Sequence, residues 1–485
     1  MVFILFFITS RSMIDFSSYS QNNNYSLKSK YQVESRNSDC FKNQIISSRI
    51  SDQNVQICFY NCSFTSFNRL TDNSTKINGY IISLSSAISK FDLCCFFDNS
   101  INSAQQSLVY LNSSFSNFSD CNFSNNSINI SVDYRGFLIH SISSNFSVNN
   151  CTFTNNYAYS DKAEIDFDIY GGLIYIENSN SLINFSSFIE NAIYIYTGND
   201  KHFHVDINGG LIASFKSHCD FIECYFINNT FVVNIIHGFR LVGGLIHLLS
   251  SNGSIKSCIS AGNILTSNIG GDYYIIGGLV YSEKSNYTFS FCVFKTNNIT
   301  MNQISEPFHY IQGGLIHLYE SYNDFIECSF QNNIMFINVS YHITDILGGS
   351  ILSRSSKCSI SKCLFLKNNI YITSYDHKYF RGSVYLENSF FIFSFCTFSN
   401  NNYTFIGYRS YNHDGGLLYV SYSHCDLIGC SYLDNYLYGS SISLYGSNGT
   451  INECSFANNV FTIWNDMLIH YIYPYRTIQF IEQIL

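Results

Sequence analysis

The sequence predicts an all-β solenoid, in which one chain winds into a single parallel β-helix of about 12 to 13 rungs. Three observations predict this fold. A short stretch recurs along the chain, and its clearest copy, Gly313–Asn333, reads GGLIHLYESYNDFIECSFQNN. The spacing inside the stretch is constant, while the distance between copies varies. The composition favours strands over long helices.

The repeat is anchored on a serine. Its template is G-G-L-Φ-x-Φ-x-x-S, then an apolar residue four places on, then C-x-F-x-x-N, where Φ is apolar. In nine consecutive copies the Cys position lies seven residues after the Ser, whereas the distance between serines is mostly 33 to 38 residues. Coils with fixed corners and variable loops produce this pattern. The anchoring serines are Ser86, Ser114, Ser143, Ser179, Ser217, Ser251, Ser285, Ser321, Ser356, Ser389, Ser423 and Ser447.

The composition narrows the function classes. Charged residues make up 12% of the 485-residue chain, and there are two prolines. The abundant β-branched, aromatic, Asn and Ser residues disfavour long helices. The net charge is −9 and no basic stripe is present, so nucleic acid is not an expected partner. No cofactor is expected.

The chain divides into four parts. Residues 1–12 contain the apolar run Val2–Ile8 and are interpreted as a signal peptide, with the start of a capping strand as the alternative. Residues 13–57 form a polar leader or cap, residues 58–459 the β-helix, and residues 460–485 a C-terminal cap that is either a strand or an amphipathic helix. No stretch of eighteen apolar residues occurs, so no transmembrane span is expected.

Equivalent residues of successive rungs should stack about 4.8 Å apart and form columns. The Asn that ends the repeat is expected to pass amide hydrogen bonds from coil to coil, and to take the left-handed backbone of a tight corner. This column contains Asn126, Asn156, Asn191, Asn229, Asn263, Asn297, Asn333, Asn368, Asn401, Asn435 and Asn459.

Twelve of the eighteen cysteines fall at the C-x-F position, and Ser186 replaces the Cys once. Stacked Cα atoms lie within disulfide range, but parallel side chains oppose the torsion that a disulfide needs. Buried free thiols and bridges between rungs therefore both stay open, and an oxidising compartment would favour bridges. The column is Cys62, Cys95, Cys121, Cys151, Cys224, Cys258, Cys292, Cys328, Cys363, Cys396, Cys430 and Cys454.

Three rungs carry a second Cys, in the pairs Cys219/Cys224, Cys358/Cys363 and Cys425/Cys430. Two of them read H-C-D-x-I-x-C, with His218 and His424. A structural metal needs about four converging ligands. Because these rungs are not adjacent, no metal site is expected, and packing is favoured over a disulfide within the rung.

The densest acidic cluster is Asp161, Glu164, Asp166 and Asp168, in the loop DKAEIDFD. Polysaccharide-cleaving β-helices need clustered outward carboxylates. A single acidic loop is more often a solvated turn, so no catalytic residue is assigned. Carboxylates from a neighbouring rung beside these acids would favour an enzyme.

The fifth position of the repeat forms a partly aromatic column. When exposed, such a column stacks against sugars; otherwise it packs beneath loops. The polar excursions between repeats, such as KHFHVDIN and YDHKYFR, are expected to be surface loops, where binding residues concentrate. The candidate binding face consists of Tyr175, His247, Tyr281, His317, Tyr385 and Tyr419, with Ala213 and Leu352 interspersed.

The paired signatures GG-[small/apolar]-[I/L/V] and FxxN resemble the repeats of chlamydial polymorphic outer-membrane proteins and of related protist surface proteins. Here they read GGLI, as in Gly171–Ile174 and Gly313–Ile316, and FxxN, as in Phe188–Asn191 and Phe330–Asn333. The resemblance spans residues 58–459 and implies a right-handed parallel β-helix that is displayed at a cell surface and used in adhesion. Leu replaces the usual Ala of the family, and its C-terminal membrane β-barrel is missing.

These features predict a non-catalytic surface or secreted protein that adheres or binds through loops and lateral faces. Sequons such as Asn252, Asn286 and Asn448 favour a eukaryotic secretory route over bacterial autotransport. The expected partner is a host or cell-surface protein or a glycan. A glycan-active enzyme and a structural spacer rod are the alternatives: an enzyme requires a cleft with two or more carboxylates, and a spacer requires a featureless lateral face.

Overall fold

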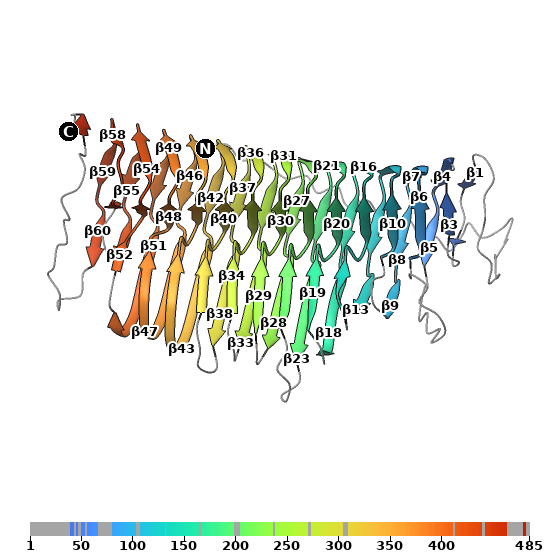
Figure 1. Ribbon diagram of the computed structural model, residues 1–485, viewed down its shortest axis with the longest axis horizontal. Helices are drawn as coiled ribbons and strands as arrows, with labels where there is room; N and C mark the ends of the chain where they lie inside the picture. The colour runs from blue at the N-terminus through green and yellow to red at the C-terminus, as the bar shows by residue number, and fades with distance from the viewer. Residues whose placement is uncertain are drawn as a thin grey trace, which may run out of the picture.

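The computed structural model describes residues 39–42, 45–46, 50–53, 56–65, 80–102, 107–130, 132–163, 166–197, 204–235, 238–269, 273–303, 309–410, 413–438, 442–462 and 479–481. In these residues the chain forms an all-β, right-handed parallel solenoid, an elongated rod whose coils stack along one axis (Figure 1). The predicted fold class is confirmed. No helix in the described part of the chain is long and apolar enough to cross a membrane.

Each coil adds one strand to each of three parallel sheets, named here A, B and C in the order in which a coil visits them. Sheet A follows the Gly-Gly pair and has 13 strands. They are β3 (Ile50–Gln53), β6 (Ile82–Ser85), β10 (Val109–Asn112), β15 (Ile139–Ile142), β20 (Ile174–Glu177), β25 (Ile212–Phe215), β30 (Ile246–Leu249), β35 (Val280–Glu283), β40 (Ile316–Tyr319), β44 (Ile351–Arg354), β48 (Val384–Glu387), β53 (Leu418–Ser421) and β57 (Ile442–Tyr445).

Sheet B follows the Ser corner and has 15 strands. They are β1 (Asp39–Lys42), β4 (Gln56–Tyr60), β7 (Ile88–Asp92), β11 (Phe115–Ser119), β16 (Asn145–Asn149), β21 (Asn180–Asn184), β26 (His218–Ile222), β31 (Asn252–Lys256), β36 (Asn286–Ser290), β41 (Tyr322–Ile326), β45 (Lys357–Ser361), β49 (Phe390–Ser394), β54 (His424–Ile428), β58 (Thr450–Asn452) and β61 (Gln479–Ile481).

Sheet C follows the Cys corner and has 14 short strands. They are β2 (Ile45–Ile46), β5 (Ser63–Thr65), β8 (Cys95–Phe97), β12 (Asn122–Ser124), β17 (Thr152–Thr154), β22 (Ser187–Ile189), β27 (Tyr225–Ile227), β32 (Ile259–Ala261), β37 (Val293–Lys295), β42 (Ser329–Gln331), β46 (Leu364–Leu366), β50 (Thr397–Ser399), β55 (Ser431–Leu433) and β59 (Ser455–Ala457).

After the Asn corner the chain runs outward and then returns to the next Gly-Gly pair, which builds a two-layered extension along one side of the rod (Figure 1). The outward strands are β9 (Ser100–Asn102), β13 (Ser127–Asn129), β18 (Tyr157–Ala163), β23 (Ala192–Thr197), β28 (Thr230–Ile235), β33 (Ile264–Ile269), β38 (Asn298–Gln303), β51 (Asn402–Ser410), β56 (Tyr436–Tyr438) and β60 (Val460–Thr462). The returning strands are β14 (Tyr134–Arg135), β19 (Phe167–Tyr170), β24 (Val205–Asn208), β29 (Phe239–Val242), β34 (Tyr273–Ile276), β39 (His309–Gln312) and β52 (His413–Gly415). Two long strands, β43 (Ile334–Leu347) and β47 (Asn369–Arg381), run through both layers.

The extension corrects the expectation that the polar excursions are surface loops. Parts of KHFHVDIN and YDHKYFR lie in β24 and β47. The outward strand β28 buries Phe231, Val233 and Ile235, and the returning strand β29 buries Phe239 and Leu241. Half-buried side chains alternate with buried ones along β28, and in β29 Arg240 is half-buried between Phe239 and Leu241. The two layers therefore enclose an apolar space of their own that continues the interior.

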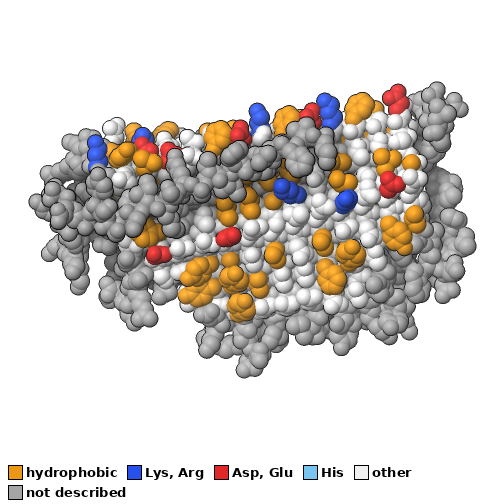
Figure 2. All heavy atoms as spheres, turned by 180° about the vertical axis from the view of Figure 1, so that it is seen from behind, with side chains coloured by type: hydrophobic (Ala, Val, Ile, Leu, Met, Phe, Trp, Pro, Cys, Tyr) orange, Lys and Arg blue, Asp and Glu red, His pale blue; other side chains and the backbone are white. Residues whose placement is uncertain are grey.

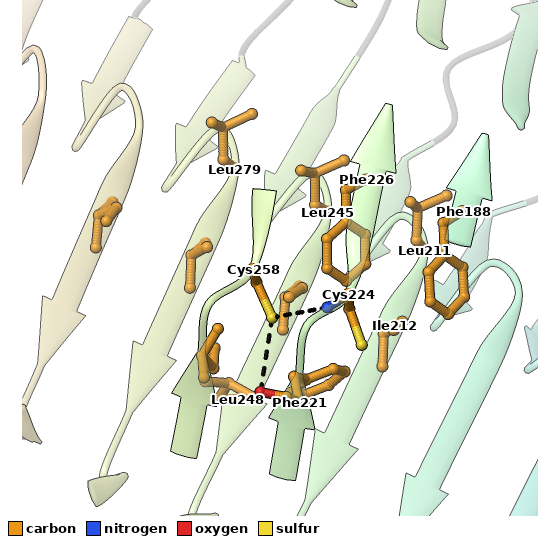
Figure 3. Packing of buried hydrophobic residues seen from close by; sticks show 14 of the residues in the cluster. Phe188, Leu211, Ile212, Phe221, Cys224, Phe226, Leu245, Leu248, Cys258 and Leu279 are labelled. Carbon is orange, nitrogen blue, oxygen red and sulfur yellow. Dashed lines mark hydrogen bonds between the residues drawn. The ribbon is translucent and has the colours of Figure 1, made fainter. Parts of the chain in front are cut away.

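Columns of like side chains fill the interior. The Phe of C-x-F stacks on its equivalent in the next coil, with ring centroids 5.0 Å apart for Phe188 and Phe226. Leu211, Leu245 and Leu279 of successive coils point into the same space (Figure 3). On the face opposite to the one seen in Figure 1, charged side chains are few away from the upper edge of the described surface (Figure 2).

A left-handed residue precedes each corner. Lys216, Glu223 and Asn228 have φ of 48°, 52° and 54°, and each stands one position before a corner Ser, Cys or Asn. The prediction that the Asn itself takes the left-handed backbone is therefore wrong. The preceding residue makes the turn, and this directs the Asn side chain inward, where it is buried.

The Gly-Gly pair makes the remaining corner. Gly313 has a φ of 64°, which a residue with a Cβ adopts only under strain. A Cβ on Gly314 would overlap the side chain of Met335 and the carbonyl oxygen of Gly349 in the next coil. The pair is therefore required by conformation at the first position and by close stacking at the second.

The Asn column is a continuous chain of buried amide hydrogen bonds. Asn191 Nδ2 donates to Asn229 Oδ1 at 3.0 Å, and the backbone N–H of Asn191 donates to the same oxygen at 3.1 Å. Asn229 Nδ2 donates onward to Asn263 Oδ1 at 2.9 Å and to the Phe188 carbonyl at 2.9 Å. The bonding continues as far as Asn459, and Asn99 adds one residue that the sequence did not assign. All six asparagines selected from the sequence, Asn191, Asn229, Asn263, Asn297, Asn333 and Asn368, lie in this chain.

Two of the twelve serines were misaligned by one residue. Ser86 and Ser143 are the left-handed residues, with φ of 51° and 49°. Ala87 and Ser144 take their places in the column, since the Ser114 N–H donates to Ser144 Oγ at 3.0 Å and the Ala87 N–H donates to Ser114 Oγ at 3.1 Å.

The ends of the solenoid also differ from the predicted boundaries. Strand β1 begins at Asp39 and pairs with β4, so coils start inside the segment 13–57 that was assigned to a leader or cap. Strand β61 pairs with β58, so Gln479–Ile481 extends sheet B as a strand. The predicted signal peptide, residues 1–12, lies outside the described residues.

Replacing one Asn of the column should destabilise the whole rod. Asn297→Ala leaves the N–H groups of Asn263 without an acceptor in a buried corner, and we expect a loss of about 3 kcal/mol in the free energy of unfolding. Urea denaturation followed by circular dichroism measures it. The matched control is Asn338→Ala, at an exposed position of β43, and equal losses for the two variants would contradict the assigned role of the column.

Candidate functional site

The Cys column forms hydrogen bonds instead of disulfides. Cys258 Sγ accepts from the backbone N–H of Cys224 at 3.4 Å and donates to the Phe221 carbonyl at 3.6 Å (Figure 3). Ser186 makes the same pair of contacts with oxygen. The column cysteines that the structure describes are not disulfide-bonded. Of the two alternatives for the six cysteines selected from the sequence, Cys224, Cys258, Cys292, Cys328, Cys363 and Cys396, the structure therefore shows unbridged thiols.

One member of the predicted column is corrected. Cys94 Sγ donates to the Phe59 carbonyl at 3.4 Å, whereas Cys95 is half-exposed in β8. The two adjacent cysteines made both alignments compatible with C-x-F. Outside this column, Cys58 is disulfide-bonded.

The second cysteines do not build a metal site. Cys219 is fully buried and points inward, while His218 and Asp220 on either side of it are partly exposed and point outward. Alternation along β26 therefore separates the ligand types. Among the described residues, no three His, Cys, Asp or Glu side chains lie close enough to hold a metal ion.

The H-C-D motif builds two equivalent polar clusters on the outer face of sheet B. His218 Nε2 lies 3.0 Å from Asp220 Oδ2, and Ser254 Oγ of the next coil donates to Asp220 Oδ1 at 2.7 Å. The second cluster has the same bonds in His424, Asp426 and Thr450. The hydroxyl contacts the carboxylate and not the imidazole, so the histidine is not placed to activate it as a nucleophile.

The candidate binding column on sheet A is buried. Its members, Tyr175, His247, Tyr281, His317, Tyr385 and Tyr419, are between 0% and 5% exposed. Tyr281 and His317 meet edge to face with their centroids 5.2 Å apart, and the neighbouring pairs His247–Tyr281 and Tyr385–Tyr419 are tilted. These rings offer no accessible surface, so they pack inside the protein, which was the favoured interpretation of this column, and the candidate binding face is withdrawn.

The column extends further than the sequence indicated. His140 packs against Tyr110 and Tyr175, with centroids 5.2 and 5.1 Å apart. It was missed because the misplaced Ser143 shifted its coil by one residue. Neither ring nitrogen of His247 has a hydrogen-bond partner, and burial, assisted by the charge of Arg240, lowers its pKa to about 3.

Three carboxylates from consecutive coils form a row on the outer side of the returning strands. Asp168 on β19 faces Asp206 on β24, and Asp133 Oδ1 accepts a hydrogen bond from the Asp168 N–H at 2.8 Å. His204 Nε2 lies 2.8 Å and Arg240 3.8 Å from the Asp206 carboxylate. Partial burial, reinforced by the charge of Asp206, raises the pKa of Asp168.

The acidic loop contributes only part of this row. Besides Asp168, its Asp166 accepts a hydrogen bond from the backbone N–H of His204 at 2.6 Å. Glu164 lies outside the described residues, as does the side chain of Asp161. One signal could have revealed the row: Asp133, Asp168 and Asp206 each stand three residues before a left-handed glycine.

A shallow groove of about 670 Å³ runs along the corner between sheets A and B. Tyr322, Phe390 and Tyr422, exposed by 52%, 40% and 59%, provide its aromatic surface. Lys284 Nζ lies 3.7 Å from Glu320 Oε2 in the next coil. The groove crosses five coils, about 19 Å at 4.8 Å per coil. The complete lining is Lys284, Ser285, Asn286, Glu320, Ser321, Tyr322, Ser355, Ser356, Lys357, Asn388, Ser389, Phe390 and Tyr422.

Contacts within the protein position Lys357 and Phe390 of the groove. Lys357 Nζ lies 6.0 Å from the centroid of the Phe390 ring, and Phe390 stacks on His424 at 4.7 Å. The repeat pattern did not indicate this groove, since its aromatic and charged residues occupy positions where the residue type varies from coil to coil, and only its corner serines are constant. No protein-family model matches the chain, and no curated protein matches it.

Acid should destabilise the protein through the buried histidines. The pKa values of His140 and His247 fall to about 3 in the folded state, from 6.5, so stability present above pH 6.5 is lost as the pH falls toward 3. At pH 5 each should cost about 2 kcal/mol. Urea unfolding between pH 7 and 4 should show a shallower loss in His247→Phe. His218→Phe, which removes an exposed histidine with a raised pKa, should not reduce the loss, and a pH dependence unchanged by His247→Phe would refute the assignment.

Proposed function

We propose that this protein is a non-catalytic β-solenoid of the polymorphic outer-membrane repeat type, which is secreted or displayed at a cell surface and binds a glycan or a surface protein. The groove between sheets A and B carries the proposal. It combines three exposed rings with amide, hydroxyl and charged groups on a rigid frame. Exposed rings beside hydrogen-bonding groups are the usual means of binding sugars and extended peptides.

The shape of the groove favours an extended ligand. Each coil contributes one exposed side chain at the start of its sheet B strand, so a linear chain lying parallel to the axis meets a polar, aromatic or cationic group at each step. In coil order these side chains are Asn286, Tyr322, Lys357 and Phe390. A spacer rod would need none of these exposed rings. The lateral corner, rather than the excursion loops, is therefore the proposed binding surface.

Two observations support a secretory route. Cys58 is disulfide-bonded, and disulfides form in oxidising compartments. The sequons Asn252 and Asn448 lie at exposed positions of the described surface, where a glycan can be attached. The numerous free thiols do not oppose this route, because burial protects most of them from oxidation.

A binding screen tests the groove. The full chain is passed over a glycan array and over host-type cells, and the strongest ligand is then titrated against Tyr322→Ala and Tyr422→Ala. Each substitution should weaken binding about fivefold to tenfold, because a stacked ring contributes about 1 kcal/mol. Tyr436→Ala, a ring exposed by 44% on β56, is the control. Absence of binding above background, or equal losses in all three variants, would contradict the proposal.

A glycan-active enzyme is a second candidate, supported by the carboxylate row. Asp168, with its raised pKa, has the character of a general acid, and the carboxyl group of Asp206 on the adjacent strand is placed beside it as the second acid of a pair. Arg240 would contact an acidic sugar. Asp206 comes from the coil next to the acidic loop, and a carboxylate from a neighbouring rung was the observation expected to favour an enzyme.

Release of reducing ends from a panel of polysaccharides tests this candidate. If the row is catalytic, Asp168→Asn and Asp206→Asn should each lower the rate at least 100-fold. Asp324→Asn is the matched control, since Asp324 is also half-buried and its pKa is also raised by burial. No release by the unmodified protein, or an equal loss in the control, would remove this candidate.

A further inference from the structure

The corner between sheets B and C forms an exposed ridge that carries bulky apolar residues in an unfavourable backbone conformation. Leu93, Phe185, Phe291 and Phe395 have φ between 48° and 56° and are 44% to 59% exposed. A left-handed backbone costs a bulky side chain about 1 kcal/mol or more, and exposure of the ring recovers none of this cost. In Figure 2 the upper edge of the molecule shows hydrophobic groups separated by charged ones.

These apolar residues recur every third coil. The backbone N–H of each ridge residue donates to the residue just before its equivalent in the next coil, which fixes the order of the ridge without ambiguity. Three coils correspond to about 14 Å. In coil order the ridge reads Asn61, Leu93, Asp120, Asn150, Phe185, Glu223, Ser257, Phe291, Glu327, Lys362, Phe395, Gly429 and Glu453.

The fold does not require this period. The equivalent positions at the Asn corner are mostly Asn, Asp or Gly, as in Asn155, Asn228 and Asp434, residue types that tolerate the left-handed backbone. A regular departure from the residue type that suits the backbone indicates a role at the surface. The ring of Phe395 lies against Gly429 of the next coil, so it flanks the ridge line instead of filling the core.

We propose that two copies of this chain associate side by side and antiparallel along this ridge. A two-fold axis between the coils of Glu223 and Ser257 brings every apolar residue of one copy opposite an apolar residue of the other. Phe185 then meets Phe291, and Leu93 meets Phe395. The period of about 14 Å is a property of this chain, so a second copy matches it along the full length of the ridge.

The charges select the antiparallel arrangement. With the same axis, Asp120 faces Lys362 of the second copy, Glu327 faces Asn150, and Glu223 faces Ser257. No like charges meet. In a parallel arrangement each of these groups would face its own copy, so that Asp120, Glu223, Glu327 and Lys362 would all be opposed by a like charge. The intrachain pair of Lys362 and Glu327, 3.2 Å apart, leaves Lys362 on the surface.

The size of the ridge predicts a weak dimer. A contact about 50 Å long and 10 Å wide buries on the order of 500 Å² per copy, below the 800 Å² typical of stable complexes. Association should therefore depend on concentration. The ridge is a different corner from the groove between sheets A and B, so this inference does not rest on the proposed ligand and can fail independently of it.

A charge exchange tests the register. Sedimentation equilibrium of the full chain should show a reversible monomer–dimer transition. Lys362→Glu places two acids opposite each other, and Asp120→Lys places two bases opposite each other, so each should weaken the dimer at least tenfold. The double variant restores opposite charges and should recover the dissociation constant to within a few-fold. Lys367→Glu is the control, because Lys367 has the same left-handed backbone but lies at the Asn corner, away from the ridge, and this change should have no effect.

A second variant separates association from folding. Phe291→Asn relieves the left-handed strain, so its thermal midpoint should equal or exceed that of the unmodified chain while the dimer weakens. A monomer at every concentration would overturn the proposal. So would a double charge variant that stays as weak as the single ones, or a Phe291→Asn protein that dimerises normally.

Discussion

The solenoid depends on one interaction: at each polar corner, a buried side chain accepts the backbone N–H of the equivalent residue in the neighbouring coil. Asn229 does so with an amide oxygen, Ser217 with a hydroxyl and Cys258 with a thiol. The left-handed residue before each of them turns the side chain inward, where no water competes for the bond. The chain between the corners can then vary in length without disturbing the stack.

The sequence was sufficient to predict the parts of the fold that these corners specify. The constant Ser-to-Cys spacing and the terminal Asn predicted the columns, because each corner is built from a few adjacent residues. The predicted member of a column was wrong by one residue where two adjacent residues of the same type both fitted the repeat, as with Cys94 and Cys95 or Ser143 and Ser144. The position that takes the left-handed backbone could not be predicted from the sequence, because residues as different as Lys216, Phe291 and Asn228 occupy it.

The surfaces with functional potential were harder to predict for a related reason. The fifth position of the repeat attracted attention because it is repeatedly aromatic, yet a side chain that recurs in this way was serving the packing of sheet A. The aromatic and charged members of the groove occupy positions whose residue type varies between coils, and the aspartates of the carboxylate row share one position in only three coils. Both sets come together only through the register of the strands. Asp168 and Asp206 are neighbours because thirty-eight residues of chain complete one coil and place Asp206 opposite Asp168 on the adjacent strand.

The direction of the corner bonds has a consequence for how the molecule is made. The acceptor for Asn191 is supplied by Asn229, which lies later in the chain, and the same order holds at the Ser and Cys corners. During synthesis, a turn that has left the ribosome keeps unpaired donors until the following turn arrives to close it. Assembly is thus vectorial, and the tip that is still growing is always the least complete part.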